Sequence, residues 1–151
     1  MRVATWNLLH GIALTAQDSP PRLAQVASEL KADLIGLQEV DRSQPRSNFE
    51  HQTQIVAQAM DLPHWIFAPA LIGTPGESWE TANDLHLHQT GHANQTGHAN
   101  QMPNDSQPQY GVGLASRYPI ENLNVMRFKA APISLPLLIP GNPKPQVIKV
   151  A

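Results

Sequence analysis

The chain has 151 residues, which is enough for one domain with a hydrophobic core. Its 10 basic and 12 acidic side chains give a net charge of -2, without the basic stripe typical of tight, non-specific nucleic-acid binding. The lack of cysteine excludes disulfides and thiolate metal sites. No apolar run is long enough to span a membrane and no signal-peptide pattern opens the chain, so we expect a cytoplasmic protein.

The first predicted element is a strand at the N-terminus. Residues Val3 to Trp6 are apolar or β-branched, and they are followed by Asn7 and a turn at Gly11. This pattern predicts a strand buried on both faces, with its polar residue at the carboxyl end. Open α/β sheets bind ligands just outside the carboxyl ends of their strands, so Asn7 is a candidate site residue.

A helix and a second strand follow. Ser19-Pro20-Pro21 carries helix-start signals, and apolar residues in 23–30 recur at helical spacing. Leu34–Val40 is a short apolar strand that contains Gln38-Glu39 near its end. The resulting βαβ unit predicts two neighbouring parallel strands with a right-handed crossover. Asn7 and Glu39 should therefore emerge at the same edge of the sheet.

Further elements are predicted along the rest of the chain. They are a polar loop at Asp41–Glu50, a helix at Gln52–Met60, a strand at Trp65–Leu71 weakened by Pro69, a strand at Tyr110–Ser116, a strand at Glu121–Lys129, a proline-rich connector, and a strand at Gln146–Val150. Between them, 72–109 lacks periodicity and repeats TGHANQ at Thr90–Gln95 and Thr96–Gln101. Its composition predicts a variable, disordered insertion.

Glu39 is the first candidate for chemistry. A carboxylate directly after an apolar strand has to be solvated, paired or bound to a metal. Glu39 and Asn7 together offer hard oxygen atoms, which suit magnesium or manganese and not zinc. On spacing alone, the commoner alternative is that Glu39 caps a loop and Asn7 bonds to the backbone.

Three arginines and a tyrosine are candidates for binding phosphate. The guanidinium groups of Arg42, Arg46 and Arg117 could bind phosphate bidentately, and Tyr110 could donate a hydrogen bond to a phosphate oxygen. The alternatives are solvated loop charges and a tyrosine that only packs. The histidines between His86 and His98 suggest adventitious metal affinity, because a metal site needs supporting contacts that a flexible segment lacks.

Three motifs together resemble a known family. TWNLLHG, DLIGLQEVDR and YGVGLASRYPI resemble, in this order, the endonuclease/exonuclease/phosphatase superfamily of magnesium-dependent phosphoesterases, with a likeness running from Arg2 to about Val150. The resemblance implies an α/β (α+β) fold, a four-layer α/β/β/α sandwich. It implies a hydrolase that cleaves a phosphodiester or phosphomonoester by water attack on phosphorus, with Mg²⁺, or alternatively Mn²⁺, as cofactor. Glu39 matches the metal ligand, Asn7 an asparagine that orients phosphate, and Tyr110 loosely a phosphate contact.

The sequence also departs from this family. It contains neither a Gly-Asp-x-Asn segment nor a late Ser-Asp-His, which supply the water-activating aspartate and the phosphate-stabilising histidine. We therefore expect 1–151 to be the N-terminal part of one domain, with the first sheet and its helices present and the second half missing, and to be inactive alone. The alternative is a truncated, non-catalytic remnant or an interaction module.

The sequence leaves the substrate class open among nucleic acids, phospholipids and small phosphate esters. The net charge gives no indication of nucleic acid, and no protein partner is predicted. His10 lies close to Asn7 in sequence, but the pattern assigns it no role.

Overall fold

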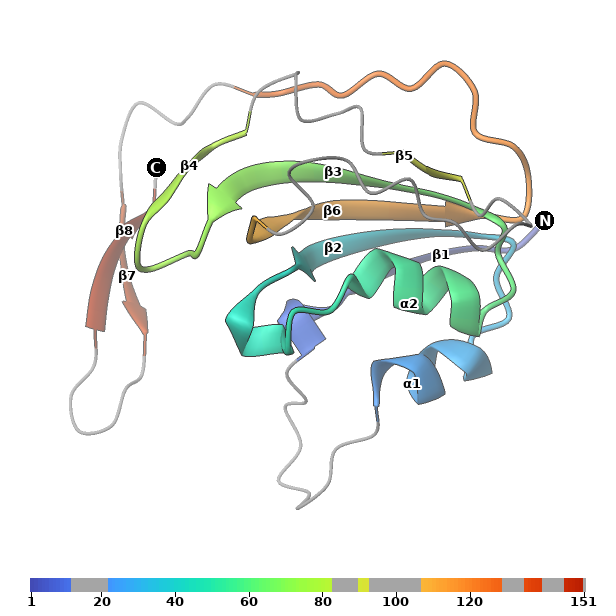
Figure 1. The fold of residues 1–151 in the computed structure, drawn as a ribbon, viewed down its shortest axis with the longest axis horizontal. Helices are drawn as coiled ribbons and strands as arrows, with labels where there is room; N and C mark the ends of the chain where they lie inside the picture. The colour runs from blue at the N-terminus through green and yellow to red at the C-terminus, as the bar shows by residue number, and fades with distance from the viewer. Residues whose placement is uncertain (12–21, 83–89, 93–106, 129–134, 140–145, 151) are drawn as a thin grey trace.

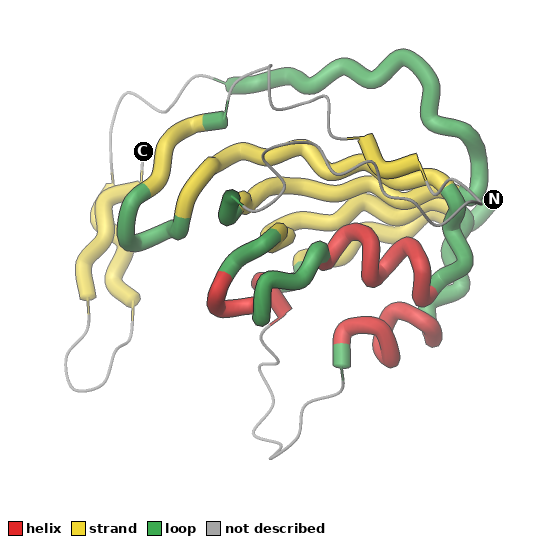
Figure 2. The backbone as a smooth tube through the Cα atoms, in the orientation of Figure 1, coloured by secondary structure: helices red, strands yellow, loops and turns green. Residues whose placement is uncertain are grey.

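Two helices lie against one face of a mixed β-sheet, and a separate two-stranded hairpin stands beside it (Figures 1 and 2). The computed structural model describes residues 1–11, 22–82, 90–92, 107–128, 135–139 and 146–150. The main sheet has 6 strands, namely β1 Val3–Asn7, β2 Leu34–Arg42, β3 His64–Gly73, β4 Trp79–Thr81, β5 Thr90–His92 and β6 Gln109–Ser116. The helical elements are α1 Leu23–Glu29, α2 Gln52–Ala59 and the short 3-10 turns η1 Leu9–Gly11 and η2 Pro45–Ser47. This is an α+β arrangement.

The N-terminal βαβ unit brings its two strands together as predicted. β1 and β2 are parallel, with Asn7 opposite Gln38, so both strands end at the same edge of the sheet. The predicted burial of β1 on both faces is wrong, since Val3 is 63% exposed. The helices cover one face only, and from β1 it is Ala4 and Trp6 that pack against the core.

The core lies between the helices and the sheet. Its buried apolar side chains come from both layers and include Ala27, Ile35, Leu37, Val40, Val56, Ala57 and Phe67. The helices predicted in 23–30 and at Gln52–Met60 are confirmed as α1 and α2, and apolar side chains of both belong to the core cluster. The helix-start residues Ser19 to Pro21 lie outside the described ranges.

β6 enters the sheet between β2 and β3 and runs antiparallel to both. It confirms the strand predicted at Tyr110–Ser116. Because of its direction, the start of β6 lies beside the end of β2, with Tyr110 opposite Asp41. Its end lies beside the start of β2, with Ser116 opposite Leu34. The direction of this one strand decides which side chains can meet at each end of the sheet.

β3 is longer than predicted and accommodates Pro69 inside the sheet. The proline lies opposite Gly111, and the pairing of β3 with β6 shifts register between Pro69 and Leu71. A Cβ on Gly111 would lie 2.8 Å from the Pro69 Cα, so glycine permits the close approach of the two strands here. The irregular register and the small neighbour together allow a strand that the proline was expected to weaken.

The strand predicted at Glu121–Lys129 is wrong for the part that the structure describes. Residues 121–128 carry no strand, and Met126 and Phe128 are exposed. Apolar side chains in this segment fit a strand pattern, but a strand also needs a neighbour to pair with. In Figure 1 this segment follows β6 as an extended connection on the far side of β3 from the helices.

Additional strands occur where the sequence indicated none. β4 and β5 both pair with β3, so the described parts of 72–109 include ordered strands, whereas 83–89 and 93–106 lie outside the described residues. β7, Leu135–Ile139, lies in the proline-rich connector and pairs antiparallel with β8, Gln146–Val150. The strand predicted at Gln146–Val150 is thereby confirmed.

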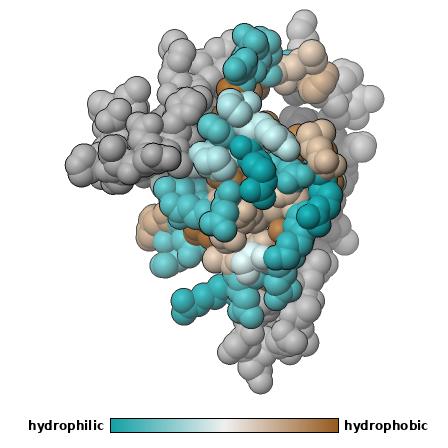
Figure 3. All heavy atoms as spheres, turned by 90° about the vertical axis from the view of Figure 1, so that its right-hand side faces the viewer, coloured by the Kyte–Doolittle hydropathy of each residue, from teal (hydrophilic) through white to brown (hydrophobic). Residues whose placement is uncertain are grey.

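Figure 3 shows the end of the molecule at which β1 begins and β6 finishes. Hydrophilic side chains cover much of the described surface there, with smaller apolar areas between them. In the described ranges, neither helix has the length and the apolar run that crossing a bilayer requires.

Candidate functional site

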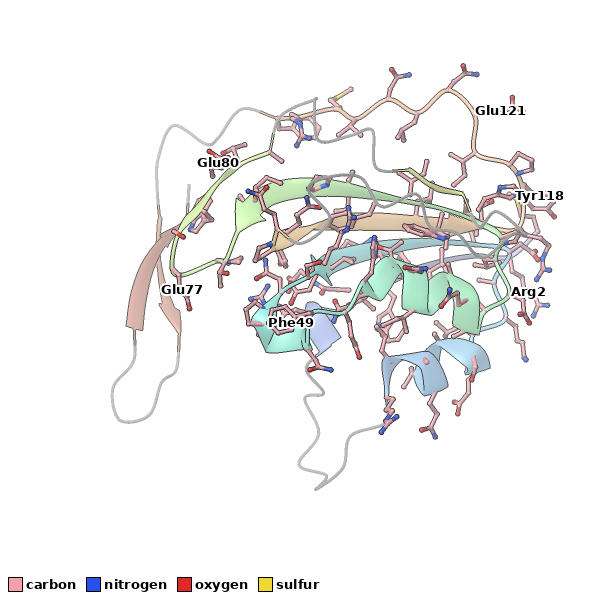
Figure 4. The ribbon with its side chains drawn as sticks, in the orientation of Figure 1. Arg2, Phe49, Glu77, Glu80, Tyr118 and Glu121 are labelled. Carbon is pink, nitrogen blue, oxygen red and sulfur yellow. The ribbon has the colours of Figure 1, made fainter. Side chains whose placement is uncertain are left out.

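The candidate site lies at the opposite end of the sheet, where β1 and β2 finish and β6 begins. The turns η1 and η2 lie beside these strand ends (Figure 1). Figure 4 shows Phe49 at this end, whereas Arg2 and Tyr118 lie at the other. Polar side chains from β1 with η1, from β2, from η2 and from β6 meet at this end.

Glu39 is presented by an irregularity in β2. The pairing of β2 with β6 shifts register between Leu37 and Val40, and Glu39 adopts a left-handed backbone with φ 54°. A non-glycine residue seldom adopts this conformation, and bulges of this kind redirect side chains at functional sites. The half-buried carboxylate accepts a hydrogen bond of 3.0 Å at Oε1 from Asn7 Nδ2. The two residues predicted to share an edge are thus in direct contact.

Tyr110 holds the same carboxylate from the other neighbouring strand. Its phenol donates a hydrogen bond to Glu39. Burial, followed by the negative charge of Glu39, raises the pKa of Tyr110 to about 12, so the hydroxyl stays protonated at neutral pH. Glu39 is therefore bound by a donor from β1 and a donor from β6.

Asp41 and Arg46 form the second part of the cluster. Asp41 is fully buried, and both of its carboxylate oxygens accept hydrogen bonds from Arg46, at 2.8 Å from Nε and 2.7 Å from Nη2. The hydrogen bond to Asp41 raises the pKa of Arg46 further. The guanidinium carbon lies 5.3 Å from the centroid of the Tyr110 ring. Arg46 is thus fixed beside the tyrosine that holds Glu39.

His10 is a member of the cluster to which the sequence assigned no role. Its ring meets that of Tyr110 edge-on, with 6.5 Å between the centroids. Burial and the positive charge of Arg46 lower the pKa of His10, although Asp41 and Glu39 act in the opposite direction. Its position three residues after Asn7, just before Gly11, was the available signal. That signal was insufficient because the ring reaches the site through an unusual turn.

Two of the three predicted phosphate-binding arginines lie elsewhere. Arg42 is 7% exposed and donates a 3.5 Å hydrogen bond from Nη1 to Gln109 Oε1. As the strand neighbour of Asp41, it belongs to the other face of β2. Arg117 bonds to Asp33 Oδ1 at 3.1 Å, at the far end of the sheet, because β6 finishes there.

The structure describes little of the histidine-rich segment. His86, His88 and His98 lie outside the described residues, and His92 belongs to β5, where only the strand pairing is described. Their predicted adventitious metal affinity stays a prediction.

The groups around Glu39 suit magnesium, which takes few protein ligands. They do not suit a metal that needs all its ligands from the protein. Within the described ranges, no group of three or more His, Asp or Glu side chains could hold a metal. Magnesium typically takes one or two carboxylates and completes its shell with water and substrate phosphate. Asn7 uses its side-chain oxygen to accept the 2.9 Å bond from Leu9 N, and its amide group faces Glu39. In this geometry the carboxylate of Glu39 offers oxygen atoms that suit such an ion, and the amide of Asn7 orients that carboxylate.

Comparison with known proteins agrees with this geometry. Residues 4–148 match the sequence model of the Endonuclease/Exonuclease/phosphatase family. Searches of curated proteins and of solved structures gave no match. The family match spans nearly the whole chain and includes β1, β2 and β6, which build the site. With Glu39 at the shared end of these strands, the chain belongs to the endonuclease/exonuclease/phosphatase family.

Proposed function

We propose that this chain binds a divalent cation, Mg²⁺ or alternatively Mn²⁺, at Glu39, with a phosphate ester beside it. The reaction that such a site serves is metal-dependent hydrolysis of a phosphodiester or phosphomonoester by attack of water on phosphorus. Members of this family are generally hydrolases that depend on a divalent metal, usually Mg²⁺. The observation that carries the proposal is the Glu39 carboxylate, presented by a bulge and held by Asn7 and Tyr110.

The residues around Glu39 have different parts in this proposal. Asn7 and Tyr110 orient the Glu39 carboxylate, which would hold the cation. A bound divalent cation stabilises the negative charge that develops on a phosphate during hydrolysis. Arg46 uses two of the five N–H donors of a guanidinium on Asp41 and retains others for a phosphate oxygen. We assign no phosphate contact to Arg42 or Arg117.

We further propose that the 151-residue chain binds the cation and phosphate without turnover. The sequence lacks the Gly-Asp-x-Asn and Ser-Asp-His segments that the family uses to activate water and stabilise the phosphate. Losing members of a set that acts as a unit typically costs several orders of magnitude in rate. The fold that accompanies this proposal is a four-layer α/β/β/α sandwich, in which the main sheet and its helices form two layers.

The second candidate function is a non-catalytic interaction module. One observation favours it: the side chains of Met126 and Phe128 are 77% and 86% exposed in a segment without strand pairing. Exposed apolar side chains close together in sequence are typical of surfaces that contact other molecules. The two candidates differ in whether Glu39 binds a cation.

Calorimetric titration of the chain and of Glu39→Gln with Mg²⁺ and Mn²⁺ tests the proposal. We expect the substitution to weaken cation binding by at least about tenfold, because it removes the charged ligand and preserves its shape. Arg117→Gln serves as the control, because Arg117 lies at the other end of the sheet. Hydrolysis of an activated phosphodiester is measured in parallel, and we expect none from either protein. Equal cation binding by the Glu39 variant would contradict the proposal, and turnover abolished by the substitution would contradict the expected inactivity.

A further inference from the structure

The turn after β1 has an unusual backbone. Leu9 and His10 both lie in the left-handed region, with φ 44° and 45°, although neither is glycine. Such strained residues persist only where their surroundings hold them, and they concentrate at functional sites. Here Asn7 Oδ1 accepts a bond from Leu9 N at 2.9 Å, and Leu8 N donates to Gln38 O at 2.9 Å. The turn is therefore tied to β1 and to β2.

The strained turn places the His10 ring among the side chains of the site. The ring contacts Tyr110 and is influenced electrostatically by Arg46, Asp41 and Glu39. Of its two nitrogens, Nδ1 is buried with no hydrogen-bond partner among the described residues. A buried N–H without an acceptor is costly, so the proton of the neutral ring resides on Nε2. His10 thus offers a hydrogen-bond donor that the contacts described above do not use.

The charges around His10 determine what this donor can bind. Asp41 and Arg46 neutralise each other through two hydrogen bonds, whereas both contacts to Glu39 come from neutral groups. The cluster therefore keeps one uncompensated negative charge and repels an isolated anion. A divalent cation on Glu39 would reverse the sign of the local charge and attract an anion. An N–H donor then becomes useful.

We propose that His10 is a substrate-binding residue, whose Nε2–H donates a hydrogen bond to an oxygen of a phosphate group bound with the cation at Glu39. This inference rests on the proposed function and adds to it a residue that the sequence pattern did not assign. It explains why a strained, non-glycine turn directs an imidazole at Tyr110. Phosphate binding should accordingly require the cation and should depend on the side chain at position 10.

Two substitutions separate phosphate binding from backbone strain. His10→Gly removes the ring and accepts the left-handed backbone without strain, so the fold should be retained or slightly stabilised. His10→Asn tolerates the same backbone and keeps a shorter N–H donor. His64→Asn applies the same change at the far end of the sheet and serves as the matched control.

The probe is inorganic phosphate, titrated into the full chain that has been saturated with Mg²⁺ and followed by calorimetry. We expect His10→Gly to weaken phosphate binding by about tenfold, as for loss of a hydrogen bond to a charged group. His10→Asn should recover part of this loss and His64→Asn should bind like the unmodified chain. The ¹⁵N resonance of His10 Nε2 should shift when phosphate is added, and a residue that only supports the turn would not produce this shift.

The outcomes are distinguishable. Unchanged phosphate affinity in His10→Gly would overturn the inference and leave the proposed function intact. A cation-loaded chain that binds no phosphate would overturn the inference together with the phosphate-binding part of the proposed function, and would leave only the cation site at Glu39. Failure of the proposed function itself would appear earlier, as absent cation binding before phosphate is added, and would overturn both.

Discussion

The two ends of the main sheet each carry an Arg–Asp pair, and the two pairs differ in almost every physical respect. At the site end, Asp41 is fully buried and accepts two hydrogen bonds from Arg46, whose side chain is 33% exposed. At the far end, Arg117 is 51% exposed and makes a 3.1 Å contact with Asp33, which is 23% exposed. The same two residue types are therefore part of a rigid cluster in one place and of a solvated surface in the other.

The backbone differs in the same way. At the site end, β2 is irregular at Glu39, and left-handed non-glycine residues occur in both neighbouring turns. At the far end, β1, β2 and β6 pair in regular register. Strain and buried charge concentrate where function is proposed, and regular pairing occurs where the chain has only to fold. Four substitutions test whether the two ends of the sheet differ in this way.

At neutral pH, the largest effect is expected from Arg46→Met. The substitution leaves Asp41 buried without its partner, and removing one member of a buried pair typically costs roughly 3–5 kcal/mol. Because Arg46 keeps contact with water, we expect a loss near the lower end of this range in urea-induced unfolding at pH 7. The double variant Arg46→Met/Asp41→Leu should recover much of the loss. A loss in unfolding free energy of about 1 kcal/mol or less, as for an exposed ion pair, would contradict the distinction between the two ends.

In acid, a pH-dependent effect is expected from His51, which precedes α2. Burial, followed by the charge of Arg42, lowers the pKa of His51 to about 3, and the ring packs edge-on against Trp65 and Phe67. Below pH 6.5 the unfolded chain takes up a proton that the folded chain does not. The contribution of His51 to the free energy of unfolding is therefore fully present above about pH 6.5. It is lost as the pH falls, by about 1.4 kcal/mol per pH unit until near pH 3.

His51→Phe isolates this contribution. The variant keeps a ring against the two aromatic neighbours and cannot take up the proton. The difference in unfolding free energy between the two proteins should be constant above pH 7 and change with pH below it. A constant difference down to pH 4 would show that His51 titrates normally in the folded chain.

A smaller effect is expected from Asn7→Ala. The variant removes one of the two donors that orient Glu39, and loss of a supporting contact typically weakens metal binding by about tenfold. Thr5→Ala is the matched control, because Thr5 also lies on the exposed side of β1 and bonds to a β2 side chain, Gln38. Titration with Mn²⁺ distinguishes them. Equal losses in both variants would indicate a general effect on β1.

The smallest effect is expected from Arg117→Gln. The pair with Asp33 is exposed and screened by water, and such pairs contribute little to stability. The variant should unfold at the same urea concentration as the unmodified chain and bind the same cation with the same affinity. A clear decrease in stability or in cation affinity would show that the end around Arg117 matters for folding or binding, contrary to this expectation.

The sequence was sufficient to predict strand pairing where the order of elements along the chain determines it. The parallel pairing of β1 and β2 follows from a βαβ unit, and with it the contact between Asn7 and Glu39. It was insufficient where the position of a residue depends on pairing between strands that are distant in sequence. The same antiparallel strand, β6, brings Tyr110 into the site and carries Arg117 away from it, and no local pattern specifies the position of β6 in the sheet.

Two other differences also depend on contacts with distant parts of the chain. His10 reaches the site through left-handed backbone at two non-glycine residues, which residue preferences disfavour and tertiary contacts impose. The segment 121–128 has strand-like composition, but the described strands do not pair with it, and pattern alone cannot supply a partner. Element types were therefore easier to predict than the neighbours that each element would find.

We expect the end of the sheet around Glu39, and not the end around Arg117, to bind a divalent cation. Paramagnetic broadening by substoichiometric Mn²⁺ in two-dimensional NMR spectra tests it directly. The Asn7 side-chain amide and the backbone amide of Tyr110 should broaden first, and the amides of Arg117 and Tyr118 should stay sharp. Glu39→Gln should abolish the effect. Broadening that is uniform, or that persists in the Glu39 variant, would contradict it.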